Sequence, residues 1–451
     1  MKKAAFRLLT AALLFSLASC GGEATDPNAG PDASEVLPAA LETVAGTQTV
    51  VVEGFDWGPA VTKIIITLEI EADDGHVTAE DFAVIETKQG FAPGAIIPGT
   101  VSAPRTVIDA YTSDAMGNRA DGDSNIITLE LSYGPNTGSP YFYDVIGTGH
   151  GGFCEPYELS IELTADSNLT ASNGASILAL EISAVDLNAA LIPQLEGVDL
   201  SGIYTSGNVT LTYSSYAPAG DGKQHPLVIW LHGAGEGGTD PSVPLLGNKA
   251  SALFGEDFQS IMGGAFVLAP QTPDRWMIYR EDGVQTSGSC YTAALMELIE
   301  RYVAANPSVD TDRIYIGGCS NGGYMTMEMV MTYPDYFAAA YPICEAYADA
   351  AITDEQLEGI KDLPIWFTYA EDDLTVLPAE YSIPTVNRLK AMGGDVHVSA
   401  FQQVLDTSGL YTDENGAPYQ YTGHWSWICF FNNECAENGV TLWDWLASKS
   451  R

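Results

Sequence analysis

The pattern of hydrophobic residues changes near residue 200, and this change limits the chain to folds built from two different halves. From about residue 38 to 195 the sequence consists of short runs rich in Val, Ile, Thr and Tyr, such as "VTKIIITLEIEA" and "NIITLELSY". Several runs alternate apolar and polar residues, and turn-rich segments such as "DAMGNRADGDS" separate them. Short alternating strands divided by turns are typical of antiparallel sheets. We therefore predict an all-β sandwich of immunoglobulin-like size over residues 38–195.

After residue 200, continuous apolar runs of strand length alternate with segments of helical period. "HPLVIWLHG", "GAFVLAPQ" and "DRIYIGG" are examples of the first kind, and "CYTAALMELIERYVAANP" is an example of the second. Uninterrupted apolar strands are buried on both faces, and their alternation with helices is typical of a parallel sheet covered on both sides. Residues 200–451 are therefore predicted to form a second domain around a mostly parallel sheet.

The N-terminus has the pattern of a targeting segment. A basic "MKKAAFR" precedes the apolar "LLTAALLFSLA", which is too short for an ordinary spanning helix. The run ends in "LASC", which resembles a bacterial lipoprotein signal. We predict a signal peptide over 1–19, a lipidated Cys20, and a flexible tether over 20–37. This predicts an exported protein anchored by lipid to the membrane at the bacterial cell surface. The alternative is an ordinary secretory signal in which Cys20 is incidental.

Charge and cysteine content exclude some classes of function. The chain has 59 acidic and 18 basic residues, a formal net charge of −41. Such a chain repels phosphate backbones, so nucleic acid is not an expected partner. No C-x-x-C pattern of a zinc site is present. Cys429 and Cys435 flank a short polar loop and are the first disulfide candidate for an exported chain, with two free thiols as the alternative.

A G-x-S-x-G pattern formed by residues 318–322 is the strongest chemical motif. Because Gly makes up 45 of the 451 residues, the pattern by itself can arise by chance. Its context is specific, since an apolar strand leads into it and a helical segment follows directly. That strand–turn–helix arrangement is what a nucleophile elbow requires, and it predicts Ser320 as an activated nucleophile. Gly318 and Gly322 would allow the turn to be tight.

A serine nucleophile needs a base and an acid that orients the base, and in this architecture the chain order is Ser, acid, His. Two histidines follow Ser320 at a distance. His397 lies within a predicted strand and is expected to be a packed residue. His424 lies in the loop "YTGHWSW" before the last helix and is predicted to be the base. Glu371, Asp372 and Asp373 all end an apolar strand, so position alone does not separate them.

A tetrahedral oxyanion needs hydrogen-bond donors. The backbone N–H of Asn321, directly after the nucleophile, is one predicted donor. The glycine-rich "LHGAGEGG" follows an early strand, and its backbone N–H groups at Ala234 or Gly235 are predicted to supply the other. His232, just before this loop, is expected to be structural.

The motifs "LHGAGEGG", "GGCSNGGYM", "AEDDLTV" and "GHWSW", in this order, resemble the α/β-hydrolase superfamily. More narrowly, they resemble secreted bacterial esterases and predicted peptidases related to polyhydroxybutyrate depolymerases. In that group the acid motif reads Gly-x-x-Asp-x-x-Val, and this chain has Ala370 where Gly is usual. The resemblance therefore implies Asp373 as the acid, followed by Val376, and it implies no metal or organic cofactor. The order of domains also resembles esterases with an N-terminal immunoglobulin-like domain.

These features predict a serine hydrolase that cleaves carboxylic esters through Ser320, His424 and Asp373 by way of an acyl-enzyme. A serine peptidase of the same fold is the first alternative, and a non-catalytic binding or adhesion lipoprotein is the second. The substrate is expected to be a small or oligomeric ester. Trp276, Trp425 and Trp427 are predicted to line its pocket, with core packing as the alternative. The β-domain could bind glycans, shape the rim of the site or mediate a homo-oligomer.

Overall fold

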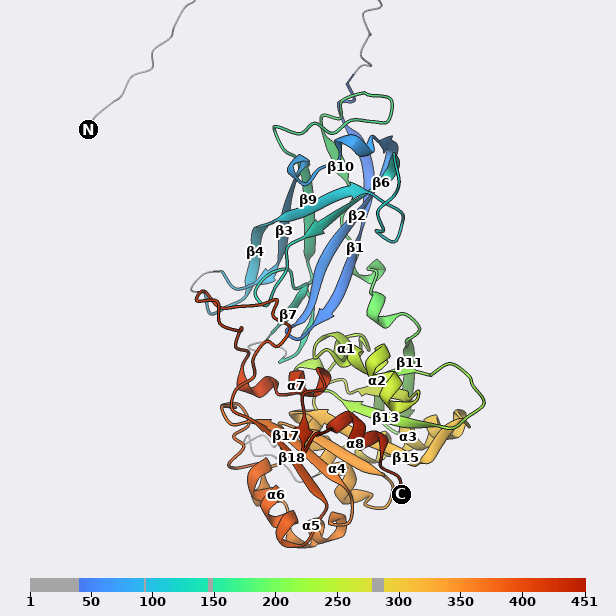
Figure 1. Cartoon of the computed structure of the whole chain (residues 1–451), viewed down its shortest axis with the longest axis vertical. Coiled ribbons are helices and arrows are strands. Elements are labelled where there is room, and N and C mark those ends of the chain that lie inside the picture. Colours follow the sequence, from blue (N-terminus) through green and yellow to red (C-terminus); the bar gives the residue numbers. More distant parts are fainter. Residues whose placement is uncertain (1–39, 93–94, 145–148, 278–287) are drawn as a thin grey trace, which may run out of the picture. The chain divides into compact units, whose positions relative to one another are not determined.

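The first half of the chain folds as a sandwich of two β-sheets (Figure 1). One sheet has the strand order β10-β1-β2-β6-β5 and the other has the order β4-β3-β9. A separate hairpin, β7-β8, lies outside both sheets. The strands are β1 (Val44–Phe55), β2 (Gly58–Ala72), β3 (Phe82–Gly90), β4 (Gly99–Arg105), β5 (Val107–Thr112), β6 (Ser124–Leu131), β7 (Tyr141–Tyr143), β8 (Gly151–Phe153), β9 (Tyr157–Leu163) and β10 (Leu180–Ile182).

Apolar and polar residues alternate along these strands, and this alternation explains why the two sheets pack together. In β2, Ile64, Ile66 and Leu68 point into one apolar cluster with side chains from both sheets. Successive side chains of a strand point to opposite faces, so each apolar set lies on the inner face. The β-sandwich predicted from the sequence is confirmed.

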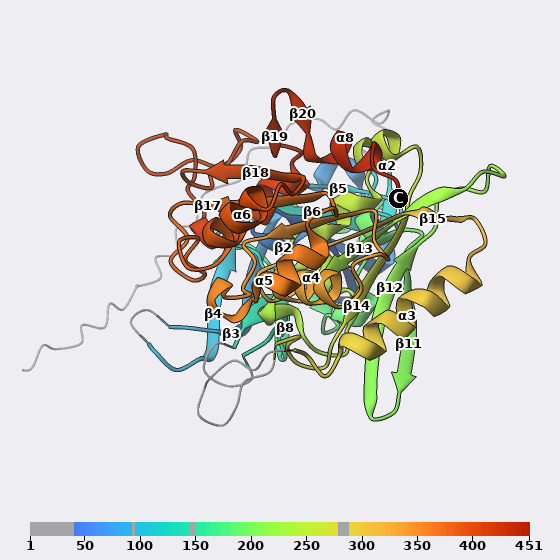
Figure 2. The ribbon, with the colours of Figure 1, turned by 90° about the horizontal axis from the view of Figure 1, so that it is seen from below.

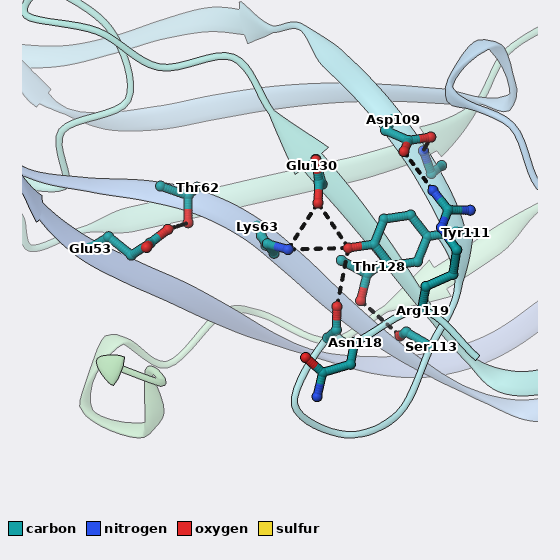
Figure 3. A network of polar contacts seen from close by, with 12 residues as sticks. Glu53, Thr62, Lys63, Asp109, Tyr111, Ser113, Asn118, Arg119, Thr128 and Glu130 are labelled. Carbon is teal, nitrogen blue, oxygen red and sulfur yellow. Dashed lines mark hydrogen bonds and ion pairs between the residues drawn. The ribbon is translucent and has the colours of Figure 1, made fainter. Parts of the chain in front are cut away.

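The outer face of the larger sheet carries polar contacts (Figure 3). Lys63 Nζ lies 2.9 Å from a carboxylate oxygen of Glu130 and 3.2 Å from the hydroxyl of Tyr111, which itself donates to Glu130 at 2.9 Å. These residues come from the adjacent strands β2, β5 and β6. Polar pairs between neighbouring strands stabilise the observed pairing register of those strands over a shifted one. The opposite face of the same sheet packs on the apolar core.

The second half folds around an eight-stranded sheet with the order β11-β12-β14-β13-β15-β16-β17-β18. Neighbouring strands from β14 to β18 pair in parallel, whereas β12 pairs antiparallel with both β11 and β14. The predicted mostly parallel sheet is therefore confirmed, with an antiparallel edge that the prediction did not include. The strands are β11 (Asp199–Ser206), β12 (Val209–Tyr216), β13 (His225–Leu231), β14 (Phe266–Gln271), β15 (Val309–Cys319), β16 (Ala339–Ile343), β17 (Ile365–Ala370) and β18 (Val396–Phe401).

Helices cover both faces of this sheet (Figures 1 and 2). Strand β13 illustrates the division, since Trp230 belongs to one apolar cluster while Ile229 and Leu231 belong to the other. The first cluster takes side chains from α1, α2, α7 and α8, and the second from α3, α4, α5 and α6. The helices are α1 (Val243–Leu246), α2 (Glu256–Met262), α3 (Thr292–Ala305), α4 (Asn321–Thr332), α5 (Asp354–Ile360), α6 (Ser382–Ala391), α7 (Trp427–Phe431) and α8 (Leu442–Ala447), and a short hairpin, β19 (Ala436–Glu437) and β20 (Val440–Thr441), precedes α8.

The computed structural model describes residues 40–92, 95–144, 149–277 and 288–451. These described residues form one compact unit. The predicted signal peptide, Cys20 and the tether lie outside the described residues. Within the described ranges, no helix has both the length and the apolar character needed to cross a bilayer.

The structure decides between the two alternatives for Cys429 and Cys435, because both residues are buried free thiols and form no disulfide. Cys429 lies in α7, and Cys435 follows the turn after that helix. The Cys435 sulfur lies 3.5 Å from the hydroxyl of Thr368 in β17, so it packs against the sheet. Burial raises the pKa of Cys435 to about 12 and that of Cys429 still further, which keeps both in the thiol form.

Candidate active site

Ser320 occupies a sharp turn between β15, which ends at Cys319, and α4, which begins at Asn321. Its backbone has φ 54° and ψ −112°, a conformation that non-glycine residues rarely adopt. The turn also lies against β13. A Cβ atom on Gly318 would lie 2.2 Å from the carbonyl oxygen of Leu231, and one on Gly322 would lie 1.9 Å from it. The two glycines are required because the elbow touches the neighbouring strand.

His424 and Asp373 approach Ser320 from two other loops. His424 lies in the 3₁₀ turn η8 (Gly423–Trp425), and Asp373 follows the end of β17. His424 Nε2 lies 3.0 Å from Ser320 Oγ, and His424 Nδ1 lies 2.8 Å from Asp373 Oδ2. These partners fit a tautomer in which Nδ1–H donates to the carboxylate and Nε2 accepts from the hydroxyl. The three side chains therefore form one continuous chain of hydrogen bonds.

The structure separates Asp373 from the two acids that precede it. The Asp373 side chain is fully buried, and its Oδ1 accepts from the backbone N–H groups of Thr375 at 2.8 Å and Val376 at 2.9 Å. Together with His424 Nδ1, these two N–H groups give the Asp373 carboxylate three hydrogen-bond partners. Asp372 instead accepts from the Gln420 side chain at 3.2 Å, and Glu371 is exposed. Only Asp373 contacts the imidazole.

Gly423 allows the acid loop and the histidine loop to approach closely. A Cβ atom at this position would lie 2.2 Å from Asp372 Oδ1 and 2.7 Å from the backbone carbon of Asp372. A side chain there would push the loop that holds His424 away from the loop that holds Asp373. Gly423 was not predicted to have this role, although it is the first residue of "GHWSW".

The predicted oxyanion donors lie at the starts of two helical turns. Asn321 is the first residue of α4, and Ala234 is the first residue of the 3₁₀ turn η5 (Ala234–Glu236). The first N–H groups of a helix have no partner within it, so they are available to an anion. Ala234 and Gly235 line the same cavity as Ser320 and His424. The structure thus brings the elbow and the glycine-rich loop to one place.

The other two histidines considered have structural surroundings. His232 is fully buried, with Nδ1 2.6 Å from the Gly233 carbonyl and Nε2 accepting from the Thr272 N–H at 3.1 Å. Burial lowers the pKa of His232 to about 4, so it stays neutral. His397 in β18 is paired with Glu437 and stacks on the ring of Trp366. Neither lines the cavity around Ser320.

One of the three predicted pocket tryptophans is placed elsewhere, and this corrects the expectation from the sequence. Trp276 is fully buried in the cluster on the α3–α6 side, where its ring nitrogen donates to the His232 carbonyl at 3.1 Å. Its backbone N–H donates to the Asn321 side chain at 2.7 Å. The Asn321 side chain, to which the sequence analysis gave no role, therefore holds the segment after β14 against the elbow.

The cavity beside Ser320 has a volume of about 480 Å³. Trp425 and Trp427 line it as predicted, and the Trp427 ring lies edge-on to the His424 ring, with 5.6 Å between the ring centroids. The β-sandwich supplies further lining residues that the sequence analysis missed, namely Trp57 from the β1–β2 turn and Tyr141, Phe142 and Tyr143 from β7. The cavity is therefore aromatic on both sides.

Comparison with known proteins agrees with this architecture. Residues 47–178 match the family described as the esterase Ig-like N-terminal domain, and residues 216–408 match the phospholipase/carboxylesterase family. A solved structure described as a thermostable esterase has a TM-score of 0.67 and 24% identity, and the match covers 90% of this chain and 99% of that one.

Two curated relatives match part of the chain. Poly(3-hydroxyalkanoate) depolymerase C of Paucimonas lemoignei is 27% identical over 167 residues, which are 34% of this chain and 37% of the relative. Poly(3-hydroxybutyrate) depolymerase of Ralstonia pickettii is 27% identical over 141 residues, 29% of this chain and 28% of the relative. The match spans about a third of the length of these relatives. Residues 47–178 and 216–408 are thus similar to an esterase Ig-like N-terminal domain and to the phospholipase/carboxylesterase family, and the solved esterase shows the same fold across both halves of the chain.

Proposed function

We propose that this protein is a carboxylic ester hydrolase with Ser320 as nucleophile, His424 as general base and Asp373 as the acid that orients the base. The observation that carries the proposal is the hydrogen-bond chain through these side chains, with distances of 2.8 Å and 3.0 Å, at the wall of a cavity. A hydroxyl alone is a weak nucleophile, and a bonded imidazole that is itself held by a carboxylate activates it.

The reaction proceeds in two halves. His424 Nε2 takes the proton of Ser320 as Oγ bonds to the ester carbonyl carbon, and the carbonyl oxygen becomes an oxyanion. The backbone N–H of Asn321, with that of Ala234 or Gly235, donates to this oxyanion. The carbon–oxygen bond to the alcohol then breaks, and His424 gives the alcohol its proton. A water activated by His424 attacks the acyl-enzyme, which releases the acid and restores Ser320.

The cavity favours uncharged esters with an apolar acyl or alcohol group. Its aromatic walls from Trp57, Tyr143, Trp425 and Trp427 bury apolar surface, and its volume of about 480 Å³ suits a small molecule or the end of an oligomer. The names of the two relatives refer to poly(3-hydroxyalkanoate) and poly(3-hydroxybutyrate), and an internal ester bond of such a polyester, away from its terminal carboxylate, would meet both conditions.

The test labels the purified full chain with a fluorophosphonate and maps the modified peptide. We expect the label on Ser320, and we expect Ser320→Ala to lower kcat on a nitrophenyl ester by about 10⁵-fold or more. Ser260→Ala is the matched control, because Ser260 is exposed on α2. Label on another residue, or full activity of Ser320→Ala, would refute the assignment. Faster cleavage of an arylamide than of the matching ester would favour a peptidase.

We also propose that the chain is exported and anchored by lipid on Cys20, on the basis of the "LASC" motif after an apolar run. Cys20→Ala should move the protein from the membrane fraction to the soluble fraction and abolish labelling by a palmitate analogue. Unchanged membrane recovery of Cys20→Ala would contradict the anchor.

A further inference from the structure

Glu236 is a partly buried carboxylic acid at the end of the predicted oxyanion loop, and the proposed reaction does not use it. It is the last residue of η5, which begins at Ala234, and it lines the same cavity as Ser320. Its side chain folds back over the loop, because a Cβ atom on Gly233 would lie 2.8 Å from Glu236 Oε2 and one on Gly247 would lie 3.2 Å from its Cγ. Burial raises the pKa of Glu236 to about 7, and the backbone N–H groups of Gly233 and Glu236 oppose this rise.

Asn248 connects this carboxyl group with the nucleophile elbow. Its side chain is buried, and its amide is oriented so that the nitrogen donates to Glu236 Oε1 at 3.2 Å and to the Gly247 carbonyl at 3.2 Å. The other end of the amide lies 2.9 Å from the sulfur of Cys319. Burial raises the pKa of Cys319 well above its usual value, so a neutral S–H can donate to the amide oxygen. The contacts run without a gap from Cys319 through Asn248 to Glu236.

We propose that Cys319, Asn248 and Glu236 form a positioning relay that sets the spacing between the two halves of the oxyanion hole. Cys319 directly precedes Ser320 and Asn321, and Glu236 directly follows Ala234 and Gly235. The relay therefore ends beside each of the predicted donors. Donors stabilise an oxyanion only at hydrogen-bond distance from its final position, so a brace between their two segments acts on the transition state. This inference rests on the proposed serine mechanism.

The relay also places a titratable group beside the developing anion. Three other titratable groups face Glu236, namely Tyr141 and Tyr143 from β7 and Cys319 from β15. Burial raises the pKa of each of the three, so each stays neutral. Ionised Glu236 therefore adds a negative charge beside the oxyanion, and neutral Glu236 does not. Burial raises the pKa of Glu236 to about 7, so this carboxyl group ionises as the pH rises above neutrality. The kcat of the parent protein should therefore fall as the pH rises through this range.

The experiment measures kcat and KM on a nitrophenyl ester from neutral to alkaline pH for the full chain. Glu236→Ala and Asn248→Ala should each lower kcat roughly 10- to 100-fold, since displaced donors cost about that much. KM should change little in both. Glu236→Gln should stay within about fivefold of the parent at neutral pH because one acceptor oxygen remains, and it should lose the alkaline fall in kcat. The double Ala variant should lose no more than the worse single variant.

Additive losses in the double variant, or an alkaline fall that persists in Glu236→Gln, would overturn the relay. If Glu236→Ala fails to fold, the pH profile of Glu236→Gln and the kcat of Asn248→Ala still decide. Glu434→Gln is the matched control, because burial raises the pKa of Glu434 as well and it lies outside the cavity. Its kcat and pH profile should match the parent. An inactive Ser320→Ala together with unaffected relay variants would refute the relay and leave the proposed function intact.

Discussion

The two walls of the cavity differ in how they are built. The hydrolase wall carries the polar groups, among them Ser320 and His424, which come from short loops at strand ends. The sandwich wall carries aromatic rings, among them Trp57 and Tyr143, which come from a hairpin turn and a short strand. The hydrolase wall holds the proposed reacting groups beside the rings of Trp425 and Trp427, whereas none of the proposed catalytic residues lies on the sandwich wall. We therefore expect changes in the hydrolase wall to alter the rate of the proposed reaction, and changes in the sandwich wall to alter the preference for the size of the acyl or alcohol group.

The sandwich wall is attached to the hydrolase wall through a buried carboxylate. Asp56 in the β1–β2 turn lies 2.6 Å from Lys249 Nζ and accepts from the Asn432 side chain at 3.1 Å. Asp56 is only 8% exposed, and it directly precedes Trp57. Removing one partner of a buried ion pair lowers the free energy of unfolding much more than removing one partner of a surface pair. The position of Trp57 is therefore set by contacts with the hydrolase half.

The largest expected effect lies on the hydrolase wall and tests whether chemistry resides there alone. Asp373→Asn should lower kcat about 10⁴-fold, because the amide favours the wrong imidazole tautomer while the loop stays in place. KM should change little. The measurement is steady-state kinetics on short and long acyl esters, with Asp372→Asn as the matched control. Equal losses in both variants would show that Asp373 has no special role.

The second effect concerns the stability of the sandwich. Glu86 is buried, and its carboxylate lies 2.8 Å from Arg105 Nη1 and accepts from the Tyr157 hydroxyl at 2.7 Å. Glu86→Ala would leave the buried Arg105 charge uncompensated and should lower the free energy of unfolding of the sandwich by about 3–5 kcal/mol. Urea unfolding followed by hydrogen exchange in β3 and β9 measures this. The exposed pair between Arg119 and Asp109 is the control, and Arg119→Ala should cost about 1 kcal/mol or less.

The smallest effect should appear on the sandwich wall and sharpen the contrast between the walls. Tyr143→Ala removes a ring that lies 3.0 Å from a Cβ atom placed on Gly235. It should change the ratio of kcat/KM for long against short acyl esters by about tenfold, which is the scale of one hydrophobic contact in a pocket. The kcat for the shortest ester should stay nearly constant. Tyr204→Ala, on β11 and outside this cavity, should leave the ratio unchanged.

The difference between the walls also explains what could be predicted from the sequence. Ser320, His424 and the loop at Ala234 were predicted because a strand, a tight turn and chain order leave a local pattern. The aromatic residues of β7 leave no such pattern in the sequence. The strand "YFY" is only three residues long, and its contacts with the cavity come from tertiary packing. The placement of Trp276 was wrong for the same reason, since an aromatic after a strand can enter either core or cavity.

Other differences come from features that the sequence expresses weakly. The antiparallel edge strands β11 and β12 contain many Ser and Thr residues, so their apolar period is poor. The role of the Asn321 side chain depends on a partner, the backbone of Trp276, that no spacing rule connects with it. The choice of Asp373 among three neighbouring acids followed from a family resemblance, and of the three it is Asp373 that contacts His424 in the structure.

The backbone of Ser320 has a consequence for how this protein can evolve. A residue with φ 54° and ψ −112° is held in place by its surroundings, at a cost of order 1–3 kcal/mol. Glycine would adopt the same turn with less strain, so the fold would gain stability by losing its proposed nucleophile. Stability and activity therefore select for different residues at this position. In a descendant that no longer needs catalysis, we would expect position 320 to be among the first to change. A relative with glycine at this position would be inactive and more stable than this protein.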